Sequence, residues 1–151
     1  MSAQQRVVLL DTDVFSALFV TPEAKARSQG YLLDQWRAAV RGYRVVIAFQ
    51  TRAEALVGAG LAKWGARRTQ ALCDRLDETP TVGLDTDVVD AYVTLTVEAS
   101  ALGIGLSHKD HVADRWIAAC AIAKAIPLLS GDRIFKGAPS LSLLALPELP
   151  K

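Results

Sequence analysis

VVLLDTDVF, residues 7–15, is the stretch that decides the fold. Its four leading apolar residues end at Asp11, and so short an apolar run is typical of a strand buried in a parallel sheet. Residues 44–49 and 126–130 repeat this pattern, residues 81–84 are a candidate short strand, and 141–146 are a candidate final strand. Helical patterns separate these runs. The alternation predicts an α/β fold of three layers, in which helices flank a central, mainly parallel sheet of four to five strands.

We expect helices between these strands, because the segments have helix-capping residues, glycines at their ends and apolar residues at helical spacing. Thr21-Pro22-Glu23 is a helix start, and Gly42 ends that helix. Further helices are expected at 51–56, 65–76, 86–102 and 107–125. No repeat or linker interrupts this order, so we expect a single domain over residues 1–151.

The bulk composition restricts the class of protein only loosely. Half of the residues are hydrophobic (51%), which is enough for a sizeable core, and the three tryptophans are expected in that core or in a dimer contact. The formal net charge of +1 creates no field that attracts a polyanion, so it neither supports nor excludes RNA as a partner. Cys73 and Cys120 are expected to be buried free thiols, and a reduced, cytoplasmic compartment fits them. No signal peptide or membrane span is expected.

Two acids stand just beyond predicted strands. Asp11 follows the first strand directly, and Asp132 follows the 126–130 strand after one glycine. Because ligand sites of parallel sheets lie beyond the carboxyl ends of the strands, both acids point into one crevice if these strands are neighbours. Each acid also has a structural alternative, since Asp11 or Asp13 could cap the next helix and Asp132 could be a turn residue.

Two further acids lie on predicted helices. Thr51-x-x-Glu54 has the form of a capping box, in which Glu54 would reach back to the first amide of its helix. Asp114 is expected well inside the helix of residues 107–125, where Asp is unfavourable unless it faces solvent or serves a purpose. Four acids in one cleft would repel one another unless cations neutralised them, and hard oxygen ligands select Mg²⁺ or Mn²⁺.

Four segments in order resemble one enzyme family. They are LLDTDVF (9–15), TRAEALVGA (51–59), DRWIAACA (114–121) and IPLLSGDRIF (126–135). Together they resemble the PIN-domain nucleases, particularly the VapC toxins of bacterial toxin–antitoxin pairs. That family more often has Asn or Ser where this chain has Asp13.

The resemblance implies a PIN fold over nearly the whole chain, with a catalytic and metal-binding site made of Asp11, Glu54, Asp114 and Asp132. It implies Mg²⁺- or Mn²⁺-dependent cleavage of RNA, often a tRNA or a ribosomal RNA. It further suggests a homodimer and a cognate antitoxin protein that blocks the site.

Several nearby side chains are candidates for supporting roles. Asp13 is a candidate outer-shell acid, and Ser130 could orient a metal ligand or bind phosphate. Arg115 and Arg133 could contact RNA phosphates, although solvated surface arginines fit the pattern equally well. His108 and His111 favour a capping, surface or RNA-contact role over general-base catalysis.

Two rival interpretations remain at this point. Asp11-Thr12-Asp13 after a buried strand also resembles the HAD phosphotransferases, which use the first Asp as nucleophile, but Phe15 and the isolated Asp132 depart from their pattern. The second rival is a PIN-like module that binds RNA or protein without catalysis. The presence of all four acids argues against a dead site.

Overall fold

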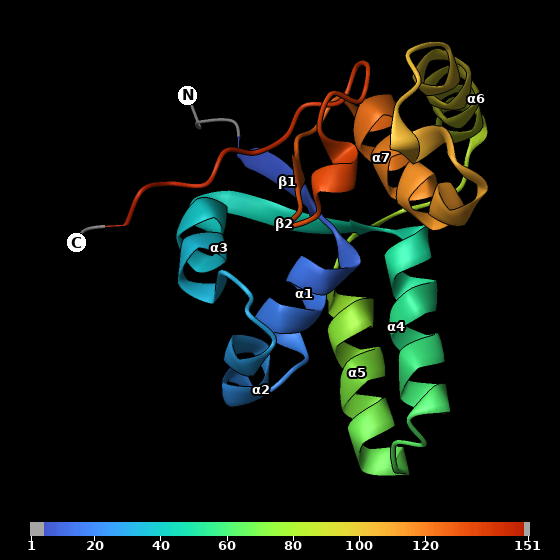
Figure 1. The fold of residues 1–151 in the computed structure, drawn as a ribbon. Helices are drawn as coiled ribbons and strands as arrows, with labels where there is room; N and C mark the ends of the chain where they lie inside the picture. Colours follow the sequence, from blue (N-terminus) through green and yellow to red (C-terminus); the bar gives the residue numbers. More distant parts are fainter. Residues whose placement is uncertain (1–4, 150–151) are drawn as a thin grey trace.

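A sheet of four parallel strands forms the centre of the computed structural model, which describes residues 5–149 (Figure 1). The strand order is β3-β2-β1-β4, and all three strand pairs are parallel. The strands are β1 (Arg6–Leu10), β2 (Tyr43–Ala48), β3 (Thr81–Val82) and β4 (Leu128–Leu129). This arrangement confirms the predicted α/β fold and places β1 beside β4.

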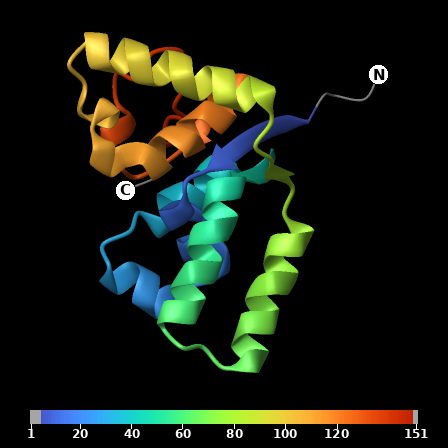
Figure 2. The same cartoon turned by 90° about the vertical axis from the view of Figure 1, so that its right-hand side faces the viewer.

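Helices cover both faces of the sheet (Figures 1 and 2). One face carries α1 (Thr12–Phe19), α2 (Glu23–Ser28), α3 (Leu33–Val40), α4 (Phe49–Leu61) and α5 (Ala66–Glu78). The other face carries α6 (Thr86–Ala101) and α7 (Val112–Lys124), with the short 3-10 helices η1 (Gly105–Ser107), η2 (Lys109–His111) and η3 (Arg133–Phe135). Figure 2 shows α4 and α5 as an antiparallel pair that projects away from the sheet. No helix within residues 5–149 combines the length and the apolar character that crossing a membrane requires.

The alternation of side chains along the strands builds a core on each face. Val8 and Leu10 point into the core beneath α1, α3 and α5, whereas Leu9 points into the core beneath α6 and α7. Leu128 and Leu129 divide in the same way. Successive residues of a strand face opposite sides, so a strand buried on both faces must be apolar throughout. This explains the unbroken apolar runs in the sequence.

Two predicted elements differ from the structure because of local backbone signals. The helix expected from Thr21 to Gly42 is two helices, α2 and α3, separated at Gly30, whose φ is +78°. Glycine adopts this left-handed conformation without strain, so the chain turns there. The strand expected at 141–146 is reduced to one parallel bridge between Leu143 and Leu128.

The two cysteines are both free thiols, as expected. Cys120 is buried in α7, but Cys73 in α5 is only half-buried.

Candidate active site

Asp11 lies at the carboxyl end of the central strand β1 and is only 6% exposed. The amide N–H of Thr12 donates to Asp11 Oδ1 (2.8 Å), so Asp11 does cap α1, which was the alternative interpretation of this acid. Its other oxygen, Oδ2, accepts a hydrogen bond from the Ser130 hydroxyl (2.7 Å). Ser130 follows β4, and the Asp11 amide donates to the carbonyl of Leu129 (2.9 Å). Because β1 and β4 are neighbours in the sheet, Asp11 contacts Ser130, which is distant from it in the sequence.

Ser130 also orders the loop that carries Asp132. Its Oγ accepts the amide N–H of Asp132 (3.0 Å), and Asp132 Oδ1 accepts the amide N–H of Ile134 (2.9 Å) at the start of η3. Gly131 lies so close to the Trp36 ring that an added Cβ would be 2.8 Å from Cζ2. Asp132 thus has the turn role considered above and still leaves Oδ2 without a hydrogen bond in the described residues.

Glu54 does not take part in a capping box, so that alternative is wrong. Helix α4 begins at Phe49 and its N-cap residue is Ala48, so Thr51 already lies in the first turn. Thr51 is fully buried, and its hydroxyl lies 2.9 Å from that of Thr12 instead of capping the helix. This contact joins the start of α1 to α4. Glu54 Oε1 is buried and has no hydrogen-bond partner among residues 5–149, which leaves it available to a ligand.

Asp114 lies in the first turn of α7 and not well inside a helix, because the predicted helix 107–125 begins only at Val112. Two 3-10 turns replace its first residues. An acid at this position is stabilised by the positive end of the helix dipole. Asp114 Oδ2 lies 2.9 Å from His111 Nδ1, and both side chains are about one-third exposed or less. His111 therefore holds Asp114 from outside the cleft.

The buried carboxylate of Asp11 has a strongly perturbed pKa. Burial raises the pKa of Asp11 to about 6, against the lowering effect of its hydrogen bonds from Ser130 and Thr12. The charges of Asp13 and Asp114 raise this pKa further. Asp11 therefore lies close enough to other acids for their charges to be felt.

The remaining acids are coupled in the same way. Burial raises the pKa of Asp13, and the charges of Asp132 and Asp114 add to this rise. Burial also raises the pKa of Glu54, the polar side chains of Gln50 and Thr12 act against this rise, and the charges of Asp114 and Asp13 add to it. Asp13 and the four predicted ligands therefore lie near enough for their charges to act on one another at the carboxyl edge of the sheet, and we call these five residues the acidic cleft.

No positive side chain neutralises the acidic cleft. Among residues 5–149, no ion pair joins Lys or Arg to any of its five carboxylates, and only His111 approaches one of them. Carboxylate oxygens are the ligands that Mg²⁺ prefers, and the unpartnered Oε1 of Glu54 adds a free donor. Within the same residues, no three His, Cys, Asp or Glu side chains are grouped tightly enough to hold a metal ion as they stand. The donor set thus fits Mg²⁺, and binding requires the carboxylates to move closer together.

A family comparison agrees with this geometry. The family model of the PIN domain matches residues 8–141. The chain belongs to the PIN domain family. This match covers all five acids of the cleft, and neither it nor the fold supports the phosphotransferase alternative.

Solved structures show the same fold. The chain is similar to VapBC2 from Rickettsia felis bound to promoter DNA, with a TM-score of 0.67 and 20% identity over 91% of this chain and 96% of that chain. It is similar to a toxin–antitoxin complex from Klebsiella pneumoniae, with a TM-score of 0.63 and 19% identity over 92% and 98% of the two chains. It is also similar to VapBC-5 from Mycobacterium tuberculosis, with a TM-score of 0.59 and 23% identity over 95% and 100%. No curated protein is significantly similar to the chain in sequence.

The two predicted RNA-contacting arginines of this PIN domain have different environments. Arg115 is 5% exposed, and its guanidinium donates to the carbonyls of Leu106 (2.8 Å) and His108 (2.7 Å) and to the Tyr92 hydroxyl (3.1 Å). Such a buried group has no surface to offer RNA, so Arg115 supports the chain that leads into α7. Arg133 is exposed and remains a candidate contact.

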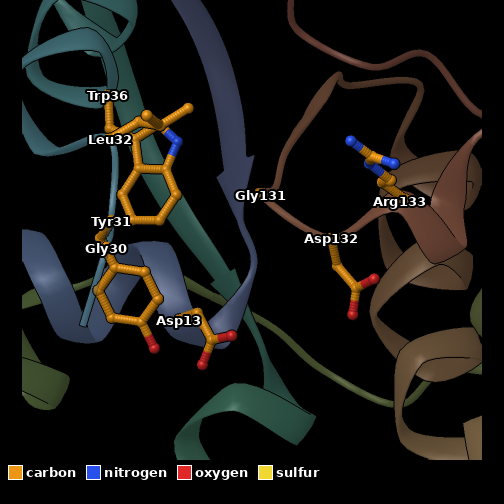
Figure 3. A pocket seen from close by; sticks show the side chains of 8 residues that line it. All are labelled: Asp13, Gly30, Tyr31, Leu32, Trp36, Gly131, Asp132 and Arg133. Carbon is orange, nitrogen blue, oxygen red and sulfur yellow. The ribbon is translucent and has the colours of Figure 1, made fainter.

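A cavity that no sequence pattern predicts lies beside the acidic cleft of this PIN domain. The cavity has a volume of about 600 Å³, and Asp13 and Asp132 line it together with Tyr31, Trp36 and Arg133 (Figure 3). Figure 3 shows Tyr31 and Trp36 on one wall and the Gly131–Arg133 segment on the other. Tyr31 was expected on the single helix from Thr21 to Gly42, but in the structure it lies in the connection between α2 and α3.

Proposed function

We propose that this PIN domain is a Mg²⁺-dependent endoribonuclease that hydrolyses RNA phosphodiester bonds and is the toxin of a toxin–antitoxin pair. The observation that carries the proposal is Asp11, a buried carboxylate in the acidic cleft that has no Lys or Arg as counter-ion among residues 5–149. Charged groups are rarely left in this condition unless a ligand completes the site. Mn²⁺ has the same preference for oxygen ligands and is the alternative ion.

In this proposal, Asp11, Glu54, Asp114 and Asp132 hold the metal, with Asp13 in an outer position. When bound, Mg²⁺ lowers the pKa of a water molecule for in-line attack and offsets the charge of the phosphate. Ser130 orients Asp11 through its 2.7 Å hydrogen bond, and His111 orients Asp114. The contact between Thr12 and Thr51 keeps α4, and with it Glu54, against the start of α1. Such supporting contacts set how well the ligands converge.

The proposed partners follow from the similar structures. The Klebsiella pneumoniae structure is a toxin–antitoxin complex, and the Mycobacterium tuberculosis protein is a member of the VapBC family of toxin–antitoxin systems. By analogy, we expect this chain to bind a cognate antitoxin, to form a homodimer and to act in the cytoplasm on a tRNA or ribosomal RNA. The net charge of +1 means that local contacts must hold this RNA.

The test is cleavage of total RNA by the purified protein, with Mg²⁺ and with EDTA. We expect cleavage only with Mg²⁺, and we expect Asp11→Asn to lower kcat by more than about 100-fold, since losing even a supporting contact of a metal site costs about 10- to 100-fold. Asp90→Asn, an exposed acid on α6, is the matched control and should cleave like the parent. Full cleavage in EDTA, or by Asp11→Asn, would contradict the metal mechanism. RNA binding without any cleavage would favour the non-catalytic module.

The antitoxin is tested separately by expression in bacteria. We expect the chain alone to arrest growth, Asp11→Asn to relieve the arrest, and co-expression of the protein encoded beside it to relieve the arrest of the parent. A parent chain that leaves growth unaffected would contradict the toxin role, while the RNA assay would still report on the nuclease.

A further inference from the structure

We propose that the cavity beside the acidic cleft is a nucleotide subsite, in which Tyr31 stacks on an unpaired base next to the scissile phosphate and Arg133 binds a neighbouring phosphate. This inference rests on the proposed nuclease function and adds the residues that choose where the RNA is cut.

The cavity is continuous with the acidic cleft. Asp13 and Asp132 belong to both, so a nucleotide in the cavity lies next to the carboxylates that would hold the metal. Its volume of about 600 Å³ is within the range of about 300–1,000 Å³ that is usual for small-ligand sites. A double-stranded segment cannot enter such a space, whereas a single base turned out of its strand can.

One wall of the cavity is aromatic. The Tyr31 and Trp36 rings lie 5.3 Å apart between centroids, at an angle of 37°. Trp36 is only 2% exposed and packs next to Tyr31, which is itself partly buried. Trp36 also packs against Gly131, which links this wall to the loop of Asp132. Aromatic rings of this kind hold unpaired bases, and each stacked base contributes about 5- to 150-fold in affinity.

The connection that carries Tyr31 is held from both sides. Arg27 of α2 pairs with Glu23 (2.8 Å) and with Asp34 of α3 (2.7 Å), so it bridges the two helices across residues 29–32. Arg37 of α3 also pairs with Glu23 (3.3 Å). Tyr31 therefore lies on a short loop between two helices that these exposed ion pairs connect.

Arg133 lines the cavity on the wall opposite Tyr31 (Figure 3). It is exposed, and among residues 5–149 it makes no ion pair, in contrast to Arg27 and Arg37. An arginine next to a space for a base is suited to bind a phosphate of the same strand through its fork of N–H donors. The base and the phosphate contact together would fix the register of the RNA in the cleft.

The experiment measures kcat, KM and base preference on single-stranded RNA libraries with Mg²⁺. We expect Tyr31→Ala to raise KM about tenfold and to flatten the base preference at one position beside the cut, with a smaller change in kcat. Tyr31→Phe keeps the stacking ring and should keep both properties. Arg133→Gln should raise KM and weaken the salt dependence of binding by about one phosphate contact.

Two matched controls lie outside the cavity. Lys136→Gln removes another exposed cation just beyond η3, and Tyr43→Ala removes a half-buried tyrosine at the start of β2. Both should retain the base preference and the KM of the parent. Thermal melting of each variant confirms that it is folded.

Binding of a fluorescent single-stranded oligonucleotide to Asp11→Asn in EDTA tests the subsite without catalysis. Adding Tyr31→Ala to this variant should weaken binding about tenfold.

Four results would overturn the subsite. A folded Tyr31→Ala variant that cleaves with the parent's KM and base preference would reject it and leave the nuclease proposal intact. A loss confined to kcat would assign Tyr31 a structural role. A loss of antitoxin binding with unchanged RNA kinetics would make the cavity a protein-docking site. If the parent protein cleaves no RNA at all, the proposed function fails, and the subsite fails with it.

Discussion

Two charged groups are buried to nearly the same extent in this molecule, but their surroundings differ. Arg115 is 5% exposed and Asp11 is 6% exposed. Arg115 directs its N–H groups at two backbone carbonyls and a tyrosine hydroxyl, which are neutral acceptors. Asp11 also has two hydrogen-bond donors, but burial raises its pKa, and the nearby carboxylates of Asp13 and Asp114 add a smaller rise.

The difference separates a structural charge from a functional one. Three neutral acceptors around Arg115 offset much of the desolvation of its charge, although its buried Nε has no hydrogen-bond partner among residues 5–149. Around Asp11 the protein adds charges of the same sign, which the proposed cation would offset. A buried charge among like charges therefore indicates a binding site more reliably than burial alone.

The largest expected effect concerns Arg115. Arg115→Met keeps much of the side-chain volume but removes three hydrogen bonds from a charged donor, each worth about 1.5–3 kcal/mol. We expect the free energy of unfolding in urea to fall by about 4 kcal/mol. Arg115→Lys should lose less, because it keeps a charged donor. If Arg115→Met were as stable as the parent, the hydrogen bonds of Arg115 would not offset the desolvation of its charge, and Arg115 would not differ from Asp11 in this respect.

Replacing Asp11 should stabilise the metal-free protein, whereas replacing Arg115 should destabilise it. Its pKa is about 6 in the folded protein and 3.8 as the ordinary value, so the folded state binds the proton more tightly. Stability is therefore full below about pH 4 and is lost as the pH rises through 6, by up to about 3 kcal/mol. Asp11→Asn lacks this titration, so in EDTA at pH 7.5 we expect it to be more stable than the parent by up to that amount.

Urea denaturation at pH 4.5 and pH 7.5 measures this difference. The gap between Asp11→Asn and the parent should be wide at pH 7.5 and narrow at pH 4.5. Saturating Mg²⁺ should stabilise the parent and reduce the gap at pH 7.5. If the difference in unfolding free energy is the same at both pH values, folding does not raise the pKa of Asp11.

A smaller effect is expected for Ser130, which is the main hydrogen-bond donor that stabilises the charged form of Asp11. Ser130→Ala removes the 2.7 Å hydrogen bond and should lower kcat on RNA by about 10- to 100-fold, as supporting contacts of metal sites do. Ser130→Thr keeps the hydroxyl and should recover much of the activity. Ser28→Ala removes an exposed hydroxyl on α2 and is the matched control. Unchanged activity in Ser130→Ala would contradict the orienting role.

The smallest effect is expected for a pair of opposite charges at the surface. Arg52 and Asp77 lie 2.8 Å apart and join α4 to α5, but both side chains are substantially exposed. A double-mutant cycle with Arg52→Ala and Asp77→Ala should give a coupling of less than about 1 kcal/mol. If this coupling energy were as large as the loss of unfolding free energy in Arg115→Met, burial would not explain why the two arginines differ in their contribution to stability.

The sequence predicted the parts of the fold and the site that follow from local patterns. The strands β1, β2 and β4 are apolar runs, and the position of Asp11 and Asp132 just after β1 and β4 placed both acids at one edge of the sheet. The position of Glu54 in α4 could also be predicted. Its capping alternative could not be rejected, because the start of α4 at Phe49 depends on Thr51 being buried against Thr12.

Other parts depend on contacts between distant segments. The burial of Arg115 requires the carbonyls of η1 and the hydroxyl of Tyr92, which is 23 residues away. The start of α7 at Val112 is set by the preceding 3-10 turns, which have no strong sequence pattern. Tyr31 gains its place from the ion pairs of Arg27 and from packing on Trp36. None of these contacts can be read from a local window.

The hydrogen bond between Ser130 and Asp11 spans 119 residues of the chain, and it has a consequence for protein synthesis. Domains assemble as the chain leaves the ribosome, from the N-terminus onward. The strand that carries Asp11 emerges early, but β4 and Asp132 emerge after almost every other element in the structure. No nascent chain can form the acidic cleft before residue 132 is free. A protein that cuts RNA would thus stay harmless to the message that encodes it during most of its own translation.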